Sequence, residues 1–360
     1  MEPFTTSSGK FSVLDWVVFV SMLVCSVSIG VYSSGVRRAG RGTTSSSSSP
    51  QQYLMGGRNM PPLPVAISLI GGFTSAISVL GNATEIYYYG TQLCTLLLGY
   101  SLAIVFIVKV TLPILYNLNI TSLNEYFELR FNSARLRKLV TGCGMASLFL
   151  YMGMCMYAPS LALSTVTNLS TVASIAIMGV VCTFYITIGG VKAVVYTDVL
   201  QTLIMLAGTV VVTVLCCYDL GGVDKVWAIA DQGQRLQFFN LDPSPFVRHT
   251  FWSTIVLGFN NMMAVVGLGQ AAFQRLASVS TLSTAVRLCW VFLLGVWSLF
   301  IIFFFCGLVA YAVYSECDPL AAGLTTKADQ IIPFLVMDKL GHLPGLPGLF
   351  VAAVYGGVLR

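Results

Sequence analysis

Long hydrophobic runs recur along the chain, separated by short polar segments. Four of them extend from Val13 to Val31, Leu93 to Val108, Val199 to Cys217 and Leu288 to Val313. Each is close to the roughly 20 apolar residues that a helix needs to cross about 30 Å of hydrocarbon. The pattern therefore predicts membrane-spanning helices at residues 11–33, 63–88, 92–116, 139–166, 172–189, 195–217, 250–272 and 285–314, with a ninth from about residue 347.

The composition supports a membrane protein. Hydrophobic residues make up 56% of the 360 residues and charged residues only 9%, whereas soluble domains carry about 25% charged residues. The ten cysteines fall mostly inside the hydrophobic runs, without the paired spacing of a metal site or a disulfide framework. The net charge of +5 comes from basic residues beside the helix ends, which argues against a nucleic-acid-binding face. We expect an all-α polytopic protein whose surroundings are the lipid bilayer.

The loops that carry Lys and Arg set the expected orientation. The Ser/Thr-rich loop at 34–62 and the loop after the third helix are basic, and such loops face the cytoplasm; their basic residues are Arg37, Arg38, Arg41, Arg58, Arg130, Arg135, Arg137 and Lys138. The N-terminus at 1–10 and the acidic connections at 218–249 and 315–346 are then extracellular. Of the Asn-x-Ser/Thr sequons, Asn82 lies in a helix, Asn119 on the inner side and only Asn168 outside, where it is the candidate for glycosylation.

The helix expected at 63–88 is interrupted in its middle. Two glycines, Gly71 and Gly72, are followed by three hydroxyl residues, Thr74, Ser75 and Ser78. In transporters such interruptions free backbone carbonyls to hold a cation, while the opened helix ends face a solute near the bilayer midplane. Close helix packing through small residues is the alternative, and this segment taken alone favours it.

The helix expected at 250–272 contains a second interruption. Glycines and amides break its apolar run, first at Gly258-Phe259-Asn260-Asn261 and again at Val266-Gly267-Leu268-Gly269-Gln270. Two interrupted helices in corresponding halves point to a binding site better than one does. Since unpaired amides are costly in hydrocarbon, Asn260, Asn261 and Gln270 must meet other helices, water or a ligand. Bonding between helices is at least as good an explanation for each of them.

Few residues of the predicted spans can ionise. Glu85 lies near the outer end of its helix and Lys109 near an inner end, where it can reach the membrane surface. Asp198 follows an expected turn at Gly189-Gly190, where it either passes a cation inward or stabilises a helix N-terminus. His249 and His342 lie in outer loops, so no histidine-based catalytic or metal site can form within the membrane. Together with the absence of a phosphate-binding loop motif, this predicts a passive or ion-coupled transporter and no enzyme.

One segment closely resembles a known signature. The run from Tyr185 to Gln201, Tyr-Ile-Thr-Ile-Gly-Gly-Val-Lys-Ala-Val-Val-Tyr-Thr-Asp-Val-Leu-Gln, is similar to that of the sodium/solute symporter family. Further resemblance extends almost from end to end, at 52–65, 157–161, 270–275, 317–320 and 347–355. It is closest to the branch of sodium-coupled monocarboxylate, multivitamin and iodide transporters.

The resemblance implies a leucine-transporter-type fold. One extra helix at 11–33 would precede a first five-helix repeat at 63–217 and an inverted, partial second repeat at 250–360. The family's sodium site would take backbone carbonyls matching Gly71 and Thr74, and Asp198 matches an aspartate on the inner ion path. Four further residues match positions near the family's substrate and ion sites: Phe73, Ser75, Ser78 and Tyr151. Sodium would be the coupling ion and no other cofactor is implied.

The end of the chain departs from the family pattern. After Tyr355 the family continues with a Ser/Thr-rich run that supplies sodium-binding hydroxyls, whereas here Gly356-Gly-Val-Leu-Arg360 follows. We therefore expect a chain truncated within its ninth helix. The first hypothesis is sodium-coupled symport of a small organic anion, a monocarboxylate or a vitamin such as biotin or pantothenate, in the plasma membrane. The alternatives are a non-transporting regulatory membrane subunit and an uncoupled solute facilitator. The oligomeric state stays open.

Overall fold

The computed structural model describes residues 11–39, 58–118, 120, 122–166 and 170–357. Helices are the only regular elements among these residues, which confirms the expected all-α class. In chain order they are α1 (Val13–Ala39), α3 (Pro62–Phe73), α4 (Ala76–Tyr89), η2 (Thr91–Thr95), α5 (Leu96–Phe106), η3 (Ile107–Thr111), α6 (Leu112–Asn117), α7 (Glu125–Phe131), α8 (Ala134–Val166), α9 (Thr171–Asp219), α10 (Val223–Gln232), α11 (Phe251–Met262), η4 (Met263–Gly267), α12 (Gln270–Leu276), α13 (Leu282–Val313), η5 (Ala328–Gln330), α14 (Ile331–Leu340) and α15 (Leu346–Gly356).

Several helices are long and apolar enough to cross a membrane. Within the described ranges there are four such stretches, Thr91–Asn117, Ala134–Leu161, Val194–Asp219 and Leu282–Val313. Two bent pairs raise the number to six if each pair counts as one span, namely α3 with α4 and the α11–η4 helix with α12. The polytopic membrane architecture expected from the hydrophobic runs is thereby confirmed.

α9 has 49 residues and covers two of the expected helices. If it were straight, Ser174 and Gln201 would lie about 40 Å apart. Instead, the Ser174 hydroxyl is hydrogen-bonded to the Tyr355 hydroxyl, and a Cβ placed on the neighbouring Gly356 would lie 3.3 Å from the Gln201 Cβ. The segment must therefore reverse direction between the two residues. The turn expected at Gly189-Gly190 falls within this span, where the backbone stays helical.

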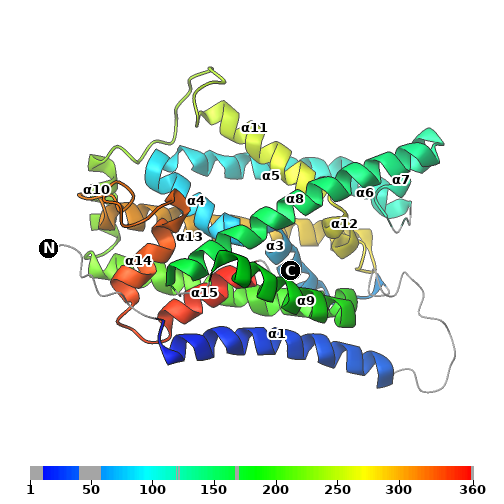
Figure 1. Cartoon of the computed structure of the whole chain (residues 1–360). Helices are drawn as coiled ribbons and strands as arrows, with labels where there is room; N and C mark the ends of the chain where they lie inside the picture. Colours follow the sequence, from blue (N-terminus) through cyan, green and yellow to red (C-terminus); the bar gives the residue numbers. More distant parts are fainter. Residues whose placement is uncertain (1–10, 40–57, 119, 121, 167–169, 358–360) are drawn as a thin grey trace.

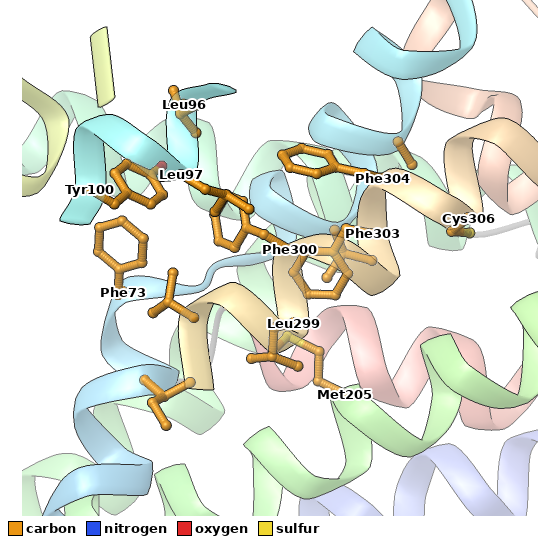
Figure 2. Close-up of a cluster of buried hydrophobic side chains, with 14 of the residues drawn as sticks. Phe73, Leu96, Leu97, Tyr100, Met205, Leu299, Phe300, Phe303, Phe304 and Cys306 are labelled. Atoms are coloured by element: carbon orange, nitrogen blue, oxygen red, sulfur yellow. The ribbon is translucent and has the colours of Figure 1, made fainter. Parts of the chain in front are cut away.

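α13 runs through the centre of the bundle, and aromatic rings fill the space around it. Figure 2 shows the main cluster, in which Phe300, Phe303 and Phe304 of α13 lie beside side chains of α3, α5 and α9. Phe73 meets Tyr100 and Phe292 edge to face, at centroid distances of 5.3 and 5.6 Å. Such pairs contribute stability beyond that of the buried area. The cluster fixes the end of α3 against α5 and α13.

α5 and α11 cross with their backbones in contact. A Cβ on Gly99 would lie 2.2 Å from the Ile255 carbonyl oxygen, and one on Gly258 would lie 2.3 Å from that of Leu96. Gly258 is thus a packing residue within the regular helix α11. The interruption expected at Gly258 to Asn261 is wrong, because close helix contact, the alternative use of glycine, explains this position.

α1 lies outside the rest of the bundle, along α9 and α15 (Figure 1). Its side chains Phe19 and Met22 are buried in a second cluster with Met178, Val351 and Tyr355. The Phe19 and Tyr355 rings meet edge to face at 5.3 Å. α1 therefore contacts α15 directly.

Candidate functional site

The expected interruption in the second predicted helix is present. α3 ends at Phe73, and α4 begins at Ala76 after a bend of 54°. Thr74 (φ −87°, ψ 110°) and Ser75 (φ −101°, ψ 175°) between them are extended. The break falls within the predicted segment from Gly71 to Ser78.

Side-chain hydroxyl groups form hydrogen bonds with some of the backbone groups at this break. The Thr74 hydroxyl and amide both donate to the Ile70 carbonyl, at 2.5 and 3.0 Å, and the Ser75 amide donates to the Ser78 hydroxyl at 3.2 Å. The last four carbonyls of a helix have no N–H donor within the helix, and at this end Thr74, which follows the helix, donates to that of Ile70. Gly71 and Thr74 are both buried, so their carbonyl oxygens face little competing water. Unwound carbonyls of this kind coordinate sodium in transporters.

The end of α15 reaches the same break. A Cβ on Gly357 would lie 2.6 Å from the Ala76 amide nitrogen and 3.0 Å from the Ser75 carbonyl carbon. The backbones are thus in direct contact, and Gly356 lies beside Gln201 of α9. Three segments that are distant in sequence meet at the break between α3 and α4.

α8 supplies two polar side chains beside Ser75. The Ser75 hydroxyl is a hydrogen-bonding neighbour of Tyr151 and of Cys155. Tyr151 is half-exposed and Ser75 is buried. The structure therefore brings together Ser75, Ser78 and Tyr151, three of the residues expected near a solute. Cys155 was missed, although it lies four residues after Tyr151 and so on the same helix face.

Phe73 points elsewhere. It is 9% exposed and lies in the aromatic cluster of Figure 2, against α5 and α13. Its position favours a packing role over the expected contact with solute.

The second interruption falls between η4 and α12. A π-helical turn ends at Gly267, Leu268 (φ −123°, ψ 1°) and Gly269 (φ −81°, ψ 125°) leave the helical geometry, and α12 follows after a bend of 62°. The Gln270 side-chain oxygen accepts a hydrogen bond from the Leu123 amide at 2.7 Å. Asn260 and Asn261 are exposed on the regular helix α11. The break expected at 266–270 is confirmed, and Gln270 stabilises a neighbouring turn.

Asp198 forms an ion pair that the sequence did not reveal. Its side chain is fully buried, and its Oδ2 accepts hydrogen bonds from the Ser68 hydroxyl at 2.6 Å and from the Arg275 guanidinium at 2.8 Å. Arg275 Nε also donates to the Ser68 hydroxyl, at 2.8 Å, and the guanidinium lies 3.0 to 3.2 Å from where a Gly72 Cβ would be. The cluster joins α3, α9 and α12. Among the described residues, Asp198 Oδ1 has no hydrogen-bond partner.

Glu85 is also paired. It bonds Arg248 at 2.5 Å and His249 at 3.0 Å, and the Arg248 guanidinium lies 4.1 Å from the centroid of the Tyr89 ring. These contacts attach the segment before α11 to the end of α4.

Among the sequons, the Asn82 side chain donates to the Ser78 carbonyl at 2.7 Å, while Asn119 and the glycosylation candidate Asn168 lie outside the described residues.

Comparison with known proteins agrees with the resemblance seen in the sequence. The family model described as the sodium:solute symporter family matches residues 53–359. The chain is 41% identical over 351 residues to mouse sodium-coupled monocarboxylate transporter 1, covering 98% of the chain and 56% of the relative. It is 40% identical to the rabbit sodium-dependent multivitamin transporter, covering 98% of the chain and 54% of the relative. The chain thus spans a little over half the length of these relatives.

A solved structure shares the fold. It is the substrate-bound outward-open state of a Na⁺-coupled sialic acid symporter, with a TM-score of 0.84 at 21% sequence identity. The match covers 97% of this chain and 71% of that one. The leucine-transporter-type architecture expected from the resemblance is therefore confirmed.

Proposed function

Since the chain belongs to the sodium:solute symporter family, we propose that it serves sodium-coupled symport of a small organic anion across the plasma membrane, with its N-terminus outside. The observation that carries the proposal is the buried break at Thr74 and Ser75, with the end of α15 against it. Two interrupted helices in one bundle are the arrangement that transporters use for ion and solute binding near the bilayer midplane.

In this proposal the carbonyl oxygens of Gly71 and Thr74 hold the sodium ion. Both belong to the last turn of α3 and the residue after it, where helix bonding no longer engages them. Asp198 carries its charge in the pair with Arg275, and its buried Oδ1 offers one further acceptor on the inner side. A sodium ion at the carbonyls of Gly71 and Thr74 would replace hydrogen bonds that the unwound backbone has lost.

The solute would lie next to the ion, against Ser75, Ser78 and Tyr151. Hydroxyl and phenol groups can donate to a carboxylate, and a bound sodium ion would offset the anionic charge in a medium of low dielectric. Because ion and solute would share one unwound segment, each would raise the affinity of the other. The proposed site does not include Asn260 and Asn261, which are exposed on α11, or Gln270, which accepts a hydrogen bond from the Leu123 amide.

The choice of solute rests on the relatives. The names of the similar proteins include monocarboxylate and multivitamin transporters, so a monocarboxylate or a carboxylate-bearing vitamin is the solute we propose. Moving one positive charge inward through 100 mV supplies about 2.3 kcal/mol, enough to concentrate such a solute appreciably.

Uptake of labelled lactate and biotin, with sodium or choline outside, tests the proposal. It is measured in cells that make this chain, and in cells that make a chimera extended by the C-terminal part of the mouse relative. We expect uptake in sodium only. Uptake that follows the solute gradient in choline would indicate a facilitator, and no uptake by either protein together with co-purification of a full-length relative would indicate a regulatory subunit.

A further inference from the structure

A single carboxylate joins α1 to the start of α15. Asp15 of α1 is 3% exposed. Its Oδ1 accepts hydrogen bonds from the amides of Gly345 and Gly348, at 2.8 and 3.0 Å. Its Oδ2 accepts from the amide and hydroxyl of Ser12, at 2.8 and 2.7 Å. Both oxygens are therefore saturated, and the side chain has one orientation.

The backbone around this carboxylate is shaped to receive it. Gly345 has a φ of +96°, which disfavours any residue with a side chain. A Cβ on Gly348 would lie 2.4 Å from the Asp15 carbonyl oxygen, so α1 and α15 touch here through their backbones. The negative charge lies at the N-terminus of α15, where free amides and the helix dipole favour an anion. Burial of an ionised group within an apolar bundle is costly and needs such compensation.

α15 connects this contact to the candidate sodium site. The helix runs from Leu346 to Gly356, about 16 Å, and the next residue, Gly357, contacts the break at Ser75 and Ala76. Tyr355 near that end is held by Phe19 of α1 and by the Ser174 hydroxyl. A helix fixed at its start therefore presents its far end to the unwound segment in a defined place.

We propose that Asp15 is a positioning residue that sets sodium affinity by holding α15 against the break between α3 and α4. The proposal rests on the proposed function. The first helix, which lies outside both repeats, then acts on ion binding without touching the ion. A residue that only anchored α1 would change the amount of folded protein and leave the sodium dependence unchanged.

The test compares sodium activation of lactate uptake in the extended chimera carrying Asp15→Asn, Ser12→Ala or Gly348→Ala. Asparagine removes the charge at the helix N-terminus, alanine at position 12 removes one of the two donors to Asp15 Oδ2 and leaves the backbone amide, and alanine at position 348 forces the two backbones apart. We expect the half-saturating sodium concentration to rise about fivefold in Asp15→Asn. The KM for lactate at saturating sodium should stay within about twofold of its original value.

The matched control is Thr281→Val, which removes the N-cap of α13, where the Thr284 amide donates to the Thr281 hydroxyl at 3.2 Å. It should leave sodium activation unchanged. If Asp15→Asn does not reach the membrane, Ser12→Ala and Gly348→Ala carry the test. Unchanged sodium activation in all surface-expressed variants would overturn the positioning role alone. An unsubstituted protein whose uptake ignores sodium would overturn the proposed function as well.

Discussion

The buried pair of Asp198 and Arg275 makes a sharp prediction about stability. Arg275→Met removes the cation and leaves a carboxylate that is fully buried with only the Ser68 hydroxyl as a donor. Breaking one side of a buried ion pair typically costs about 3–5 kcal/mol. An unfolding entropy of roughly 2.1 cal/mol/K per residue over 360 residues is about 0.76 kcal/mol/K, so about 4 kcal/mol lowers Tm by roughly 5 °C.

Thermal unfolding of the purified chain in detergent measures this loss, and a second substitution tests its cause. Asp198→Leu together with Arg275→Met removes both charges and should recover most of the stability, because an apolar pair of similar volume needs no desolvation. Arg137→Met is the matched control, since its partner Glu128 and Arg137 itself are both exposed and such pairs contribute little. If Arg275→Met unfolds at the original temperature, Asp198 is not a desolvated anion and the cluster of Ser68, Asp198 and Arg275 is wrong.

Three further substitutions separate packing from binding. Phe73→Ala should cost about 3–5 kcal/mol of stability, read as a lower Tm, because the ring fills the cluster around α13; a changed lactate KM at unchanged Tm would contradict this. Tyr151→Phe removes the phenol beside Ser75 and should raise the lactate KM about fivefold, equivalent to about 1 kcal/mol; an unchanged KM would remove Tyr151 from the solute site. Glu85→Gln should speed cleavage between residues 233 and 250 by external protease, since it weakens the contacts of Arg248 and His249; equal cleavage rates would show that other contacts hold this segment.

The hydrophobic pattern predicted both interruptions and the six described helices or bent pairs that are long and apolar enough to cross a membrane, because these features are local. Hydrophobic length marks the helices, and glycine followed by hydroxyl residues marks the break at Thr74 and Ser75. Gly258 shows the limit of this reasoning, since a packing glycine and an unwinding glycine look alike until the neighbouring helix is placed. The orientation of Phe73 could not be predicted for the same reason, because it depends on how α3 ends relative to α5.

Contacts between distant segments could not be predicted from local patterns. Arg275 lies 77 positions after Asp198, and its place beside a helix end favoured a topological role. Asp15 lies more than 300 residues before the amides that it caps. The packing of α9 and α12 on α3, and of α15 on α1, brings these groups together.

Binding of radioactive sodium to the purified, extended chimera tests the central claim most directly, with Gly71→Val compared against Gly81→Val. A Cβ on Gly81 would meet only the Ile77 side chain, at an ordinary 3.6 Å, so that variant controls for an added side chain in the neighbouring helix α4. We predict saturable binding in the unsubstituted protein and in Gly81→Val, and at least tenfold weaker binding in Gly71→Val. Equal sodium affinity in all three would contradict a site built from the carbonyls of the unwound segment.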